Sequence, residues 1–180
     1  MIYNIYMRII SGQFKGRPLK SPKSDNIRPT GDKVKQALFT KLQFEVPNAV
    51  VLDLFSGSGA LGIEALSRGA KMVYFVDKDR RSIMLTKENL NGLPTNYKVL
   101  NCGYDVALNS IKEKFDLILV DPPYASGVYD NVMELIEKND LLNDDGYVVC
   151  EHPNELKVKS CLNLIDEKRY GTVTLTFFQK

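Results

Sequence analysis

The sequence predicts a doubly wound α/β fold in which a mostly parallel sheet is covered by helices. Apolar runs of strand length alternate along the chain with amphipathic segments of helix length. The connecting loops are short, and neither an internal repeat nor a low-complexity linker interrupts the pattern. At 180 residues, 44% hydrophobic and 26% charged, the chain has the size and composition of one soluble domain. We expect a single domain over residues 1–180, with a basic hairpin and helix extension (1–45) and a core (46–180).

Apolar runs bounded by turn residues predict the strands of the sheet. Residues 49–55, AVVLDLF, are typical of a buried parallel strand, and residues 72–77, MVYFVD, form a second such run. The remaining predicted strands cover residues 97–101, 115–121, 146–152, 162–170 and 171–179. Sheets of this kind bind ligands beyond the carboxyl ends of their strands, so the residues that follow each strand are the first candidates for a site.

Apolar residues at helical spacing predict the helices between these strands. The first helix follows Thr30, a predicted N-cap, and places Val34, Ala37, Leu38 and Leu42 on one face. The other predicted helices cover residues 60–69, 80–92, 105–114 and 129–138.

Positive charge gathers at the start of the chain. Residues 1–48 hold nine Lys and Arg against three acids, a net charge of +6, whereas the remaining 132 residues carry −4. A polyanionic partner and a solvated basic tail account for the charge equally well. The segment RIISGQFKGRPLKSP, residues 8–22, favours the partner, because strand-like pieces around Gly12 and Gly16 predict an ordered basic hairpin.

The cysteines, the single histidine and the first residues disfavour several protein classes. Cys102, Cys150 and Cys161 lack C-x-x-C spacing, which is typical of reduced thiols in a cytosol. With His152 as the only histidine, a structural zinc site or a Ser-His-Asp triad is disfavoured, and we expect His152 to be a surface or capping residue. No run has the length of a membrane span, and no signal peptide is recognised, so a cytoplasmic protein is expected. Met1 and Met7 are both candidate start residues.

A glycine-rich loop follows the first strand of the core. Gly57-x-Gly59-x-x-Gly62 permits a tight turn and close approach of a ligand, and Asp77 at the tip of the next strand is placed to hold ribose hydroxyls. A simple strand-to-helix turn or a nicotinamide cofactor also accounts for this pattern. Asp53 narrows the choice, because a buried charge needs partners and a nicotinamide-binding strand normally has an apolar residue there. A cationic ligand with an amino-acid tail, such as S-adenosylmethionine, would supply those partners.

The fourth strand runs into Asp-Pro-Pro-Tyr at residues 121–124. Proline cannot donate a hydrogen bond to a strand ladder, so the strand must stop at Asp121 and form a rigid corner. A structural turn is one interpretation of these residues. Their place at the end of a strand, beside a glycine loop, favours a functional site.

These motifs together resemble the class I S-adenosylmethionine-dependent methyltransferases, which have a Rossmann-like fold. The matching motifs are D-x-F-x-G-x-G at residues 53–59, the acid Asp77, and D-P-P-Y, which marks enzymes that methylate a planar amino nitrogen. Four segments resemble more narrowly the RsmD family, bacterial 16S ribosomal RNA (guanine-N2)-methyltransferases. They are residues 7–22, 28–42, 51–70 and 116–124. The similarity covers essentially the whole chain from Met7.

The resemblance implies a division of the site between cofactor, chemistry and RNA. The core would hold S-adenosylmethionine through Asp53, Phe55, Gly57, Gly59, Asp77, Gly103 and Tyr104. Similar proteins usually carry an adenine-contacting Asp where this chain has Gly103, so backbone groups of Cys102, Gly103 or Tyr104 are expected to replace that contact. The catalytic residues would be Asp121, Pro122 and Tyr124. The RNA contacts would be Lys15, Arg17, Lys20, Lys23, Arg28, Thr30 and Pro123, and no metal is implied.

A guanine flipped out of its stack would lie on Tyr124 in this interpretation. The carboxylate of Asp121 and the carbonyl of Pro122 would accept both hydrogens of its amine and aim the nitrogen lone pair at the cofactor methyl. The expected partner is 16S ribosomal RNA, within an assembling small ribosomal subunit, and a monomer without membrane contact is expected.

Three other functions remain open. One is methylation of another RNA or of DNA adenine N6, although DNA adenine enzymes generally need a target-recognition domain that 180 residues cannot house. A non-catalytic RNA-binding protein would keep the basic extension but lose the cofactor residues. A nicotinamide enzyme is disfavoured by Asp53 and by the Asp-Pro-Pro-Tyr corner.

Overall fold

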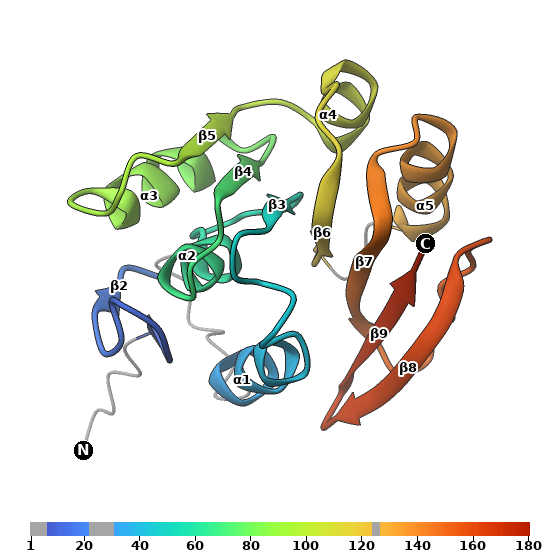
Figure 1. The fold of residues 1–180 in the computed structure, drawn as a ribbon, viewed down its shortest axis with the longest axis horizontal. Coiled ribbons are helices and arrows are strands. Elements are labelled where there is room, and N and C mark those ends of the chain that lie inside the picture. Colours follow the sequence, from blue (N-terminus) through green and yellow to red (C-terminus); the bar gives the residue numbers. More distant parts are fainter. Residues whose placement is uncertain (1–6, 22–30, 124–126) are drawn as a thin grey trace.

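The computed structural model describes residues 7–21, 31–123 and 127–180. Within these residues, a seven-stranded sheet of order β5-β4-β3-β6-β7-β9-β8 forms the centre of the molecule, and a β1-β2 hairpin lies beside it (Figure 1). The sheet strands are β3 (Val50–Asp53), β4 (Met72–Val76), β5 (Tyr97–Leu100), β6 (Phe115–Val120), β7 (Leu142–Pro153), β8 (Asn163–Tyr170) and β9 (Val173–Gln179). The hairpin strands are β1 (Met7–Arg8) and β2 (Pro18–Leu19).

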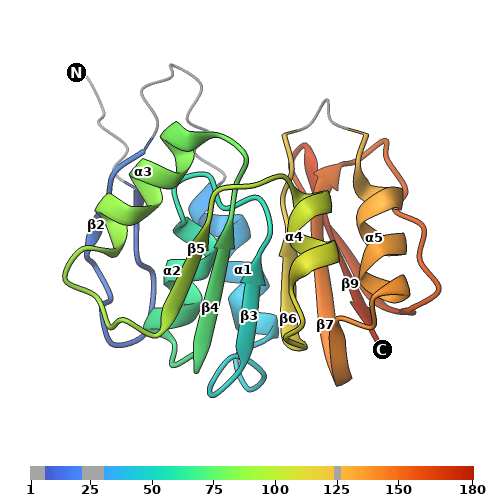
Figure 2. The same ribbon diagram turned by 90° about the horizontal axis from the view of Figure 1, so that it is seen from above.

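Helices cover both faces of the sheet (Figure 2). They are α1 (Gly31–Lys41), α2 (Ala60–Ser67), α3 (Arg80–Leu90), α4 (Tyr104–Ser110) and α5 (Tyr129–Lys138). One buried core joins α1, α2 and the hairpin to the sheet, and a second core joins α4 and α5 to the opposite face. The five neighbouring strands β5, β4, β3, β6 and β7 are parallel to one another. Strand β9 is antiparallel to both β7 and β8. The expected doubly wound, mostly parallel fold is confirmed. No described helix combines the length and apolar character needed to cross a membrane.

Two element boundaries differ by more than two residues from the sequence-based expectation. Helix α4 ends at Ser110 and not at residue 114, because Ile111 already has extended backbone angles. Strand β7 begins at Leu142, four residues before the predicted start at Gly146, because Leu142 pairs with Phe115 at the start of β6.

The expectation that His152 lies at the surface or caps an element was wrong. His152 is 1% exposed, because β7 continues past it and β9 pairs with this part of the strand. Its Nε2 lies 2.7 Å from Thr176 Oγ1 and its Nδ1 lies 2.9 Å from the Pro153 carbonyl oxygen. Its ring meets that of Tyr129 edge to face. The histidine is therefore a hydrogen-bonded core residue.

The β1-β2 hairpin is ordered against helix α2, as expected. Its tip donates two hydrogen bonds to Ser67, from Gln13 N to the carbonyl oxygen at 2.7 Å and from Phe14 N to Oγ at 3.0 Å. Gly12 has a φ of +85°, and a Cβ at this position would lie 1.9 Å from the Ser67 carbonyl oxygen. Any larger residue would force the hairpin away from the helix.

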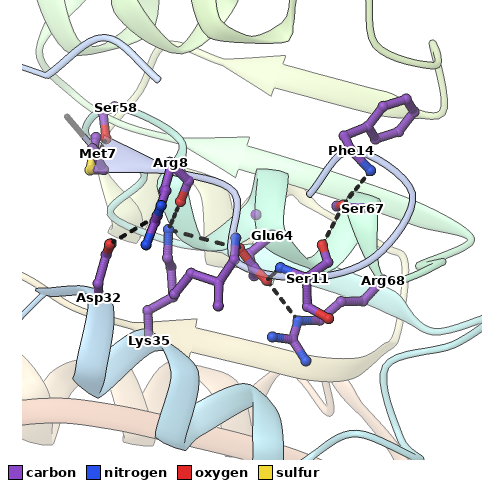
Figure 3. A network of polar contacts seen from close by, with 12 residues as sticks. Met7, Arg8, Ser11, Phe14, Asp32, Lys35, Ser58, Glu64, Ser67 and Arg68 are labelled. Carbon is purple, nitrogen blue, oxygen red and sulfur yellow. Dashed lines mark hydrogen bonds and ion pairs between the residues drawn. The ribbon is translucent and has the colours of Figure 1, made fainter. Parts of the chain in front are cut away.

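A fully buried carboxylate, Glu64 on α2, ties the hairpin and α1 to the core (Figure 3). Its two oxygens accept hydrogen bonds from Ile10 N at 2.8 Å and Ser11 N at 2.9 Å. Lys35 of α1 lies 3.8 Å away and Arg68 lies 2.8 Å away, so two cations compensate the charge. Lys35 Nζ also donates to the Arg8 carbonyl oxygen at 2.7 Å. Burial lowers the pKa of Lys35, and the Glu64 carboxylate opposes that shift.

A second buried carboxylate, Asp53, fixes the start of α2. The N-cap residue of α2 is Gly59, which has no side chain to bond the first turn. Asp53 supplies the missing acceptor from strand β3, because its Oδ2 accepts from Gly62 N at 2.9 Å. Asp53 is 1% exposed, and burial raises the pKa of its carboxyl group from 3.8 to about 7.

We expect Glu64→Ala to destabilise the protein by about 3–5 kcal/mol, because it leaves Lys35 buried without its counter-charge and two hairpin amides unpaired. Urea unfolding measures the loss. The matched control is Glu88→Ala, which removes an exposed carboxylate paired with Lys20 and should cost under about 1 kcal/mol. Equal losses for the two variants would show that Glu64 does not hold the extension.

We expect Asp53→Asn to become more stable relative to the parent protein as the pH rises from about 4 to about 7. In this window Asp53 ionises in the unfolded chain while the folded carboxyl group keeps its proton, so the free energy of unfolding of the parent falls. The amide of the variant does not titrate, so the variant does not undergo this loss. The relative gain is on the order of a few kcal/mol and levels off above the folded pKa. Urea unfolding of both proteins at pH 5 and pH 8 measures it, and a difference independent of pH would contradict the raised pKa.

Candidate active site

A cavity of about 1090 Å³ opens at the carboxyl ends of β3, β4, β6 and β7. It brings together most of the predicted cofactor and catalytic residues. Those that line it are Asp53, Phe55, Gly57, Asp77, Gly103, Tyr104, Asp121 and Pro122, whereas Gly59 is not a lining residue. Pro123, a predicted RNA contact, lines the cavity as well. Tyr124 lies outside the described residues. Helix α1 and Met7 of β1 form a further wall, so the extension contributes directly to the cavity.

The cavity has a strongly acidic lining. Its carboxylates are Asp32, Asp53, Asp77, Asp79, Asp105, Asp121 and Glu151. Among the described residues, the cationic side chains at its wall are those of Lys35 and Lys78, and Lys35 is engaged with Glu64. Such a lining favours a ligand that is cationic or rich in hydrogen-bond donors.

The glycine loop is held in place by Asp77. Gly57 and Gly59 adopt left-handed backbone angles, with φ of +54° and +81°. Asp77 Oδ2 accepts from Gly57 N at 2.9 Å, and Oδ1 accepts from Asp79 N at 2.8 Å. Thr86 of α3 donates to the Gly57 carbonyl oxygen at 3.0 Å. Asp77 therefore orders the loop, and each of its oxygens retains a second acceptor site.

The loop has features that suit a bound cofactor. A Cβ on Gly57 would point into open space, since its nearest neighbour would be the Phe55 carbonyl oxygen at 4.0 Å. The Ser56 hydroxyl is buried at the cavity wall and has no hydrogen-bond partner within the described residues. An open backbone and an unpaired hydroxyl are what an approaching polar ligand needs.

The segment after β5 presents a carboxylate to the cavity even though residue 103 is glycine. Asp105 folds back so that its Oδ1 would lie 2.5 Å from a Cβ on Gly103. The Asp105 carboxylate therefore lies close to the position where similar proteins carry an acid. The rings of Phe55 and Tyr104 lie 5.6 Å apart at the same wall.

The Asp-Pro-Pro corner follows β6 directly. Asp121 is half-buried, Pro122 is buried and Pro123 is exposed, and all three line the cavity. Strands β3 and β6 are hydrogen-bonded neighbours, so the corner lies beside the glycine loop at one edge of the sheet.

The three predicted RNA-binding cations that the structure describes are not gathered at the cavity. Lys15 is exposed at the hairpin tip, Arg17 donates to the Asn91 carbonyl oxygen, and Lys20 forms a 3.1 Å ion pair with Glu88 of α3. These three residues do not line the cavity. Lys23, Arg28 and Thr30 lie outside the described residues.

Sequence reasoning missed Ser56, Asp105 and Glu151 as cavity residues. Glu151 could have been found, because it lies at the end of a predicted strand, where ligands are expected. No sequence signal shows that the Asp105 side chain folds back toward Gly103 or that the Ser56 hydroxyl is unpaired.

Comparisons with known proteins agree with this geometry. The family model described as "Conserved hypothetical protein 95" matches residues 7–179. Ribosomal RNA small subunit methyltransferase D of Escherichia coli K12 is 36% identical over 97% of this chain and 90% of its own. The protein of the same name from Haemophilus influenzae is 33% identical over 96% and 93%. A solved structure, a hypothetical protein from Thermus thermophilus, has a TM-score of 0.83 at 32% identity and covers 96% of this chain and 99% of that one.

The match of the family model extends over nearly the whole chain, and the two named relatives align over 96% to 97% of it and over 90% to 93% of their own length. The glycine loop, Asp77 and the Asp-Pro-Pro corner, from which the resemblance was inferred, lie within the matched residues. The chain belongs to the RsmD family, whose family model is described as conserved hypothetical protein 95.

Proposed function

We propose that the protein is an S-adenosylmethionine-dependent ribosomal RNA methyltransferase that methylates the N2 amine of a guanine in 16S RNA. The observation that carries the proposal is the shared cavity, in which the glycine loop and the Asp121-Pro122 corner face the same space. Two relatives that match nearly the whole chain are named ribosomal RNA small subunit methyltransferases, which supports the same activity here. The acidic lining suits both a cationic cofactor and an amine-bearing base edge.

The cofactor lies along the β3, β4 and β5 side of the cavity. When bound, S-adenosylmethionine supplies a methyl group on a positively charged sulfur. Asp77 accepts hydrogen bonds from the ribose hydroxyls, and Gly57 and Gly59 let the backbone approach the methionine portion. Phe55, Gly103 and Tyr104 form the adenine wall. Asp53 acts through the start of α2, because its carboxylate is already bonded to Gly62 N.

The corner after β6 prepares the guanine amine. The lone pair of this nitrogen is delocalised into the ring, so the free amine is a poor nucleophile. An Asp121 oxygen accepts one amine hydrogen and the Pro122 carbonyl oxygen accepts the other, which turns the lone pair toward the methyl group. The prolines fix the carbonyl direction in advance, so little reorganisation is needed. The proton lost from the methylated nitrogen leaves along the hydrogen bond to Asp121.

Contacts to phosphates and a stacked ring position the rest of the RNA, and these contacts do not recognise its sequence. Tyr124 stacks on the flipped base beside Pro123, and Lys15, Lys23 and Arg28 contact phosphates together with Arg17, Lys20 and Thr30. Arg17 is bonded to the carbonyl oxygen of Asn91, just after α3, and Lys20 is paired with Glu88 of α3, so their charge is less available than that of exposed Lys15. The protein works as one domain and as a monomer, in the cytoplasm, on RNA of an assembling small ribosomal subunit.

We expect Asp77→Ala to weaken S-adenosylmethionine binding at least tenfold, because two charge-assisted hydrogen bonds to the ribose are lost. Since Asp77 also orders the loop, the ribose contact is isolated with a second ligand, 2′-deoxy-S-adenosylhomocysteine. Calorimetry should show that the parent prefers S-adenosylhomocysteine over its deoxy analogue and that Asp77→Ala does not. If the variant keeps the parental preference, Asp77 orders the loop but does not bind the ribose hydroxyls.

We expect Asp121→Ala to lower methyl transfer about 100-fold or more, comparable to the loss of one preorganised electrostatic partner. Transfer of labelled methyl groups to ribosomal RNA from cells lacking the protein measures the rate, and mass spectrometry locates the modified nucleotide. RNA affinity should change little, whereas Tyr124→Ala should weaken capture of the base as well. The matched control is Asp130→Ala, an exposed acid at the start of α5. A folded Asp121→Ala protein with the parental rate would end the catalytic proposal.

A further inference from the structure

Glu151 on β7 forms a second carboxylate at the Asp121 corner. Strands β6 and β7 are parallel, and their last hydrogen-bonded pair is Val120 with Cys150. Asp121 and Glu151 each follow that pair by one residue, so they are neighbours across strands that lie about 4.8 Å apart. Both residues line the cavity.

The two carboxylates also share one face of the sheet. Val120 and Cys150 pack into the core that includes α4 and α5, whereas Leu119 and Val149 pack into the core that includes α1 and α2. Because side chains alternate along a strand, Asp121 and Glu151 point to the α1 and α2 face. Asp53 at the end of β3 and Asp77 just after β4 are on that face as well, because Val51 and Phe75, two residues before them, pack into the same core.

The strand order gives these acids a sequence across the sheet. Asp77 just after β4 comes first, then Asp53 of β3, Asp121 after β6 and Glu151 of β7. Asp53 pairs with Leu119, two residues before Asp121, so it lies deeper than the other three. The proposed cofactor residues therefore lie on one side of Asp121 and Glu151 lies on the other. A base on the side of Asp121 away from the proposed cofactor residues would reach Glu151 on β7.

The backbone at Glu151 is held rigidly. Tyr129 Oη donates to the Glu151 carbonyl oxygen at 2.7 Å, and Glu151 pairs with buried Leu175 of β9. The next residue, His152, is anchored to Thr176. A rigid interior strand that presents a half-buried carboxylate to a cavity is suited to recognising a fixed hydrogen-bond donor.

We propose that Glu151 is a specificity-determining residue that accepts a hydrogen bond from N1–H of the target guanine while Asp121 accepts one from its amine. The proposal rests on the proposed function. Guanine presents N1–H and the amine side by side, two donors that match two neighbouring acceptors. Adenine presents an acceptor nitrogen beside its amine, and a carboxylate facing that nitrogen has nothing to donate. Glu151 would thus select guanine over bases that lack the ring N–H.

The test replaces the target guanine by 2-aminopurine, which keeps the 2-amine but has an acceptor in place of N1–H. The substrate is 16S RNA assembled by ligation around a synthetic segment. Loss of a hydrogen bond to a charged acceptor should lower kcat/KM of the parent about 10- to 100-fold on 2-aminopurine. Because the analogue also lacks the guanine oxygen, the decisive quantity is the guanine preference, the ratio of kcat/KM on guanine to kcat/KM on 2-aminopurine, compared between the parent and the variants.

In Glu151→Gln the side chain can accept from guanine or donate to 2-aminopurine, so the guanine preference should shrink at least about tenfold. Glu155→Gln, an exposed change outside the cavity, should keep the parental preference. The preference is a ratio within one protein sample, so incomplete folding of a variant cancels. Glu151→Ala is a second variant that should also lose the preference, because removal of the acceptor for N1–H lowers kcat/KM on the guanine substrate.

An unchanged preference in both Glu151 variants would overturn the inference while leaving the proposed function intact. A parent protein that transfers no methyl group to the guanine substrate would instead overturn the proposed function. The two failures are therefore distinguishable in one set of assays.

Discussion

The buried charge of Glu64 is the constraint on which the rest of the structure depends. A carboxylate with no exposure must be surrounded by donors and cations, and here they come from three parts of the chain. The hairpin supplies two amides, α1 supplies Lys35, and Arg68 follows directly after α2. Satisfying one charge therefore anchors the extension to the core. The same contact sets the cavity wall, because Met7 and helix α1 both line the cavity.

Acidic residues divide the cavity into zones with different tasks. Asp53 and Asp77 bond backbone amides of the glycine loop, the first turn of α2 and the segment before α3, so they shape the surface against which a cofactor lies. Asp121 and Glu151 stand on the next two strands and face the space where a base would enter. These acids are scattered in the sequence, but the strand order spaces them across the sheet edge, because neighbouring strands lie one interstrand distance apart.

Local patterns in the sequence predicted the local parts of this structure. Apolar runs and glycines predicted the strands and helices, and strand ends predicted Asp53, Asp77 and the Asp121 corner as neighbours, because the sheet alone brings them together. The placement of β9 between β7 and β8 could not be predicted, because the local sequence pattern of a strand does not indicate which strands it pairs with. His152 was misjudged for that reason: its partner Thr176 comes from β9. No local pattern marks Glu64 as a buried, paired carboxylate, because its partners Ile10 and Lys35 are distant in sequence.

The position of β9 imposes an order on folding during synthesis. Strand β9 follows β7 and β8 in the chain but lies between them in the sheet. Until residues 173–179 have been made, β7 has β6 as its neighbour in the sheet and β8 has no sheet strand to pair with among the described residues. Strands β8 and β9 form a hairpin with residues 171–172 between them, so the strand that carries Glu151 is completed when this hairpin docks on β7. A nascent chain that already holds the glycine loop and the Asp121 corner still lacks the β9 neighbour of Glu151, so the site is finished only after that docking step.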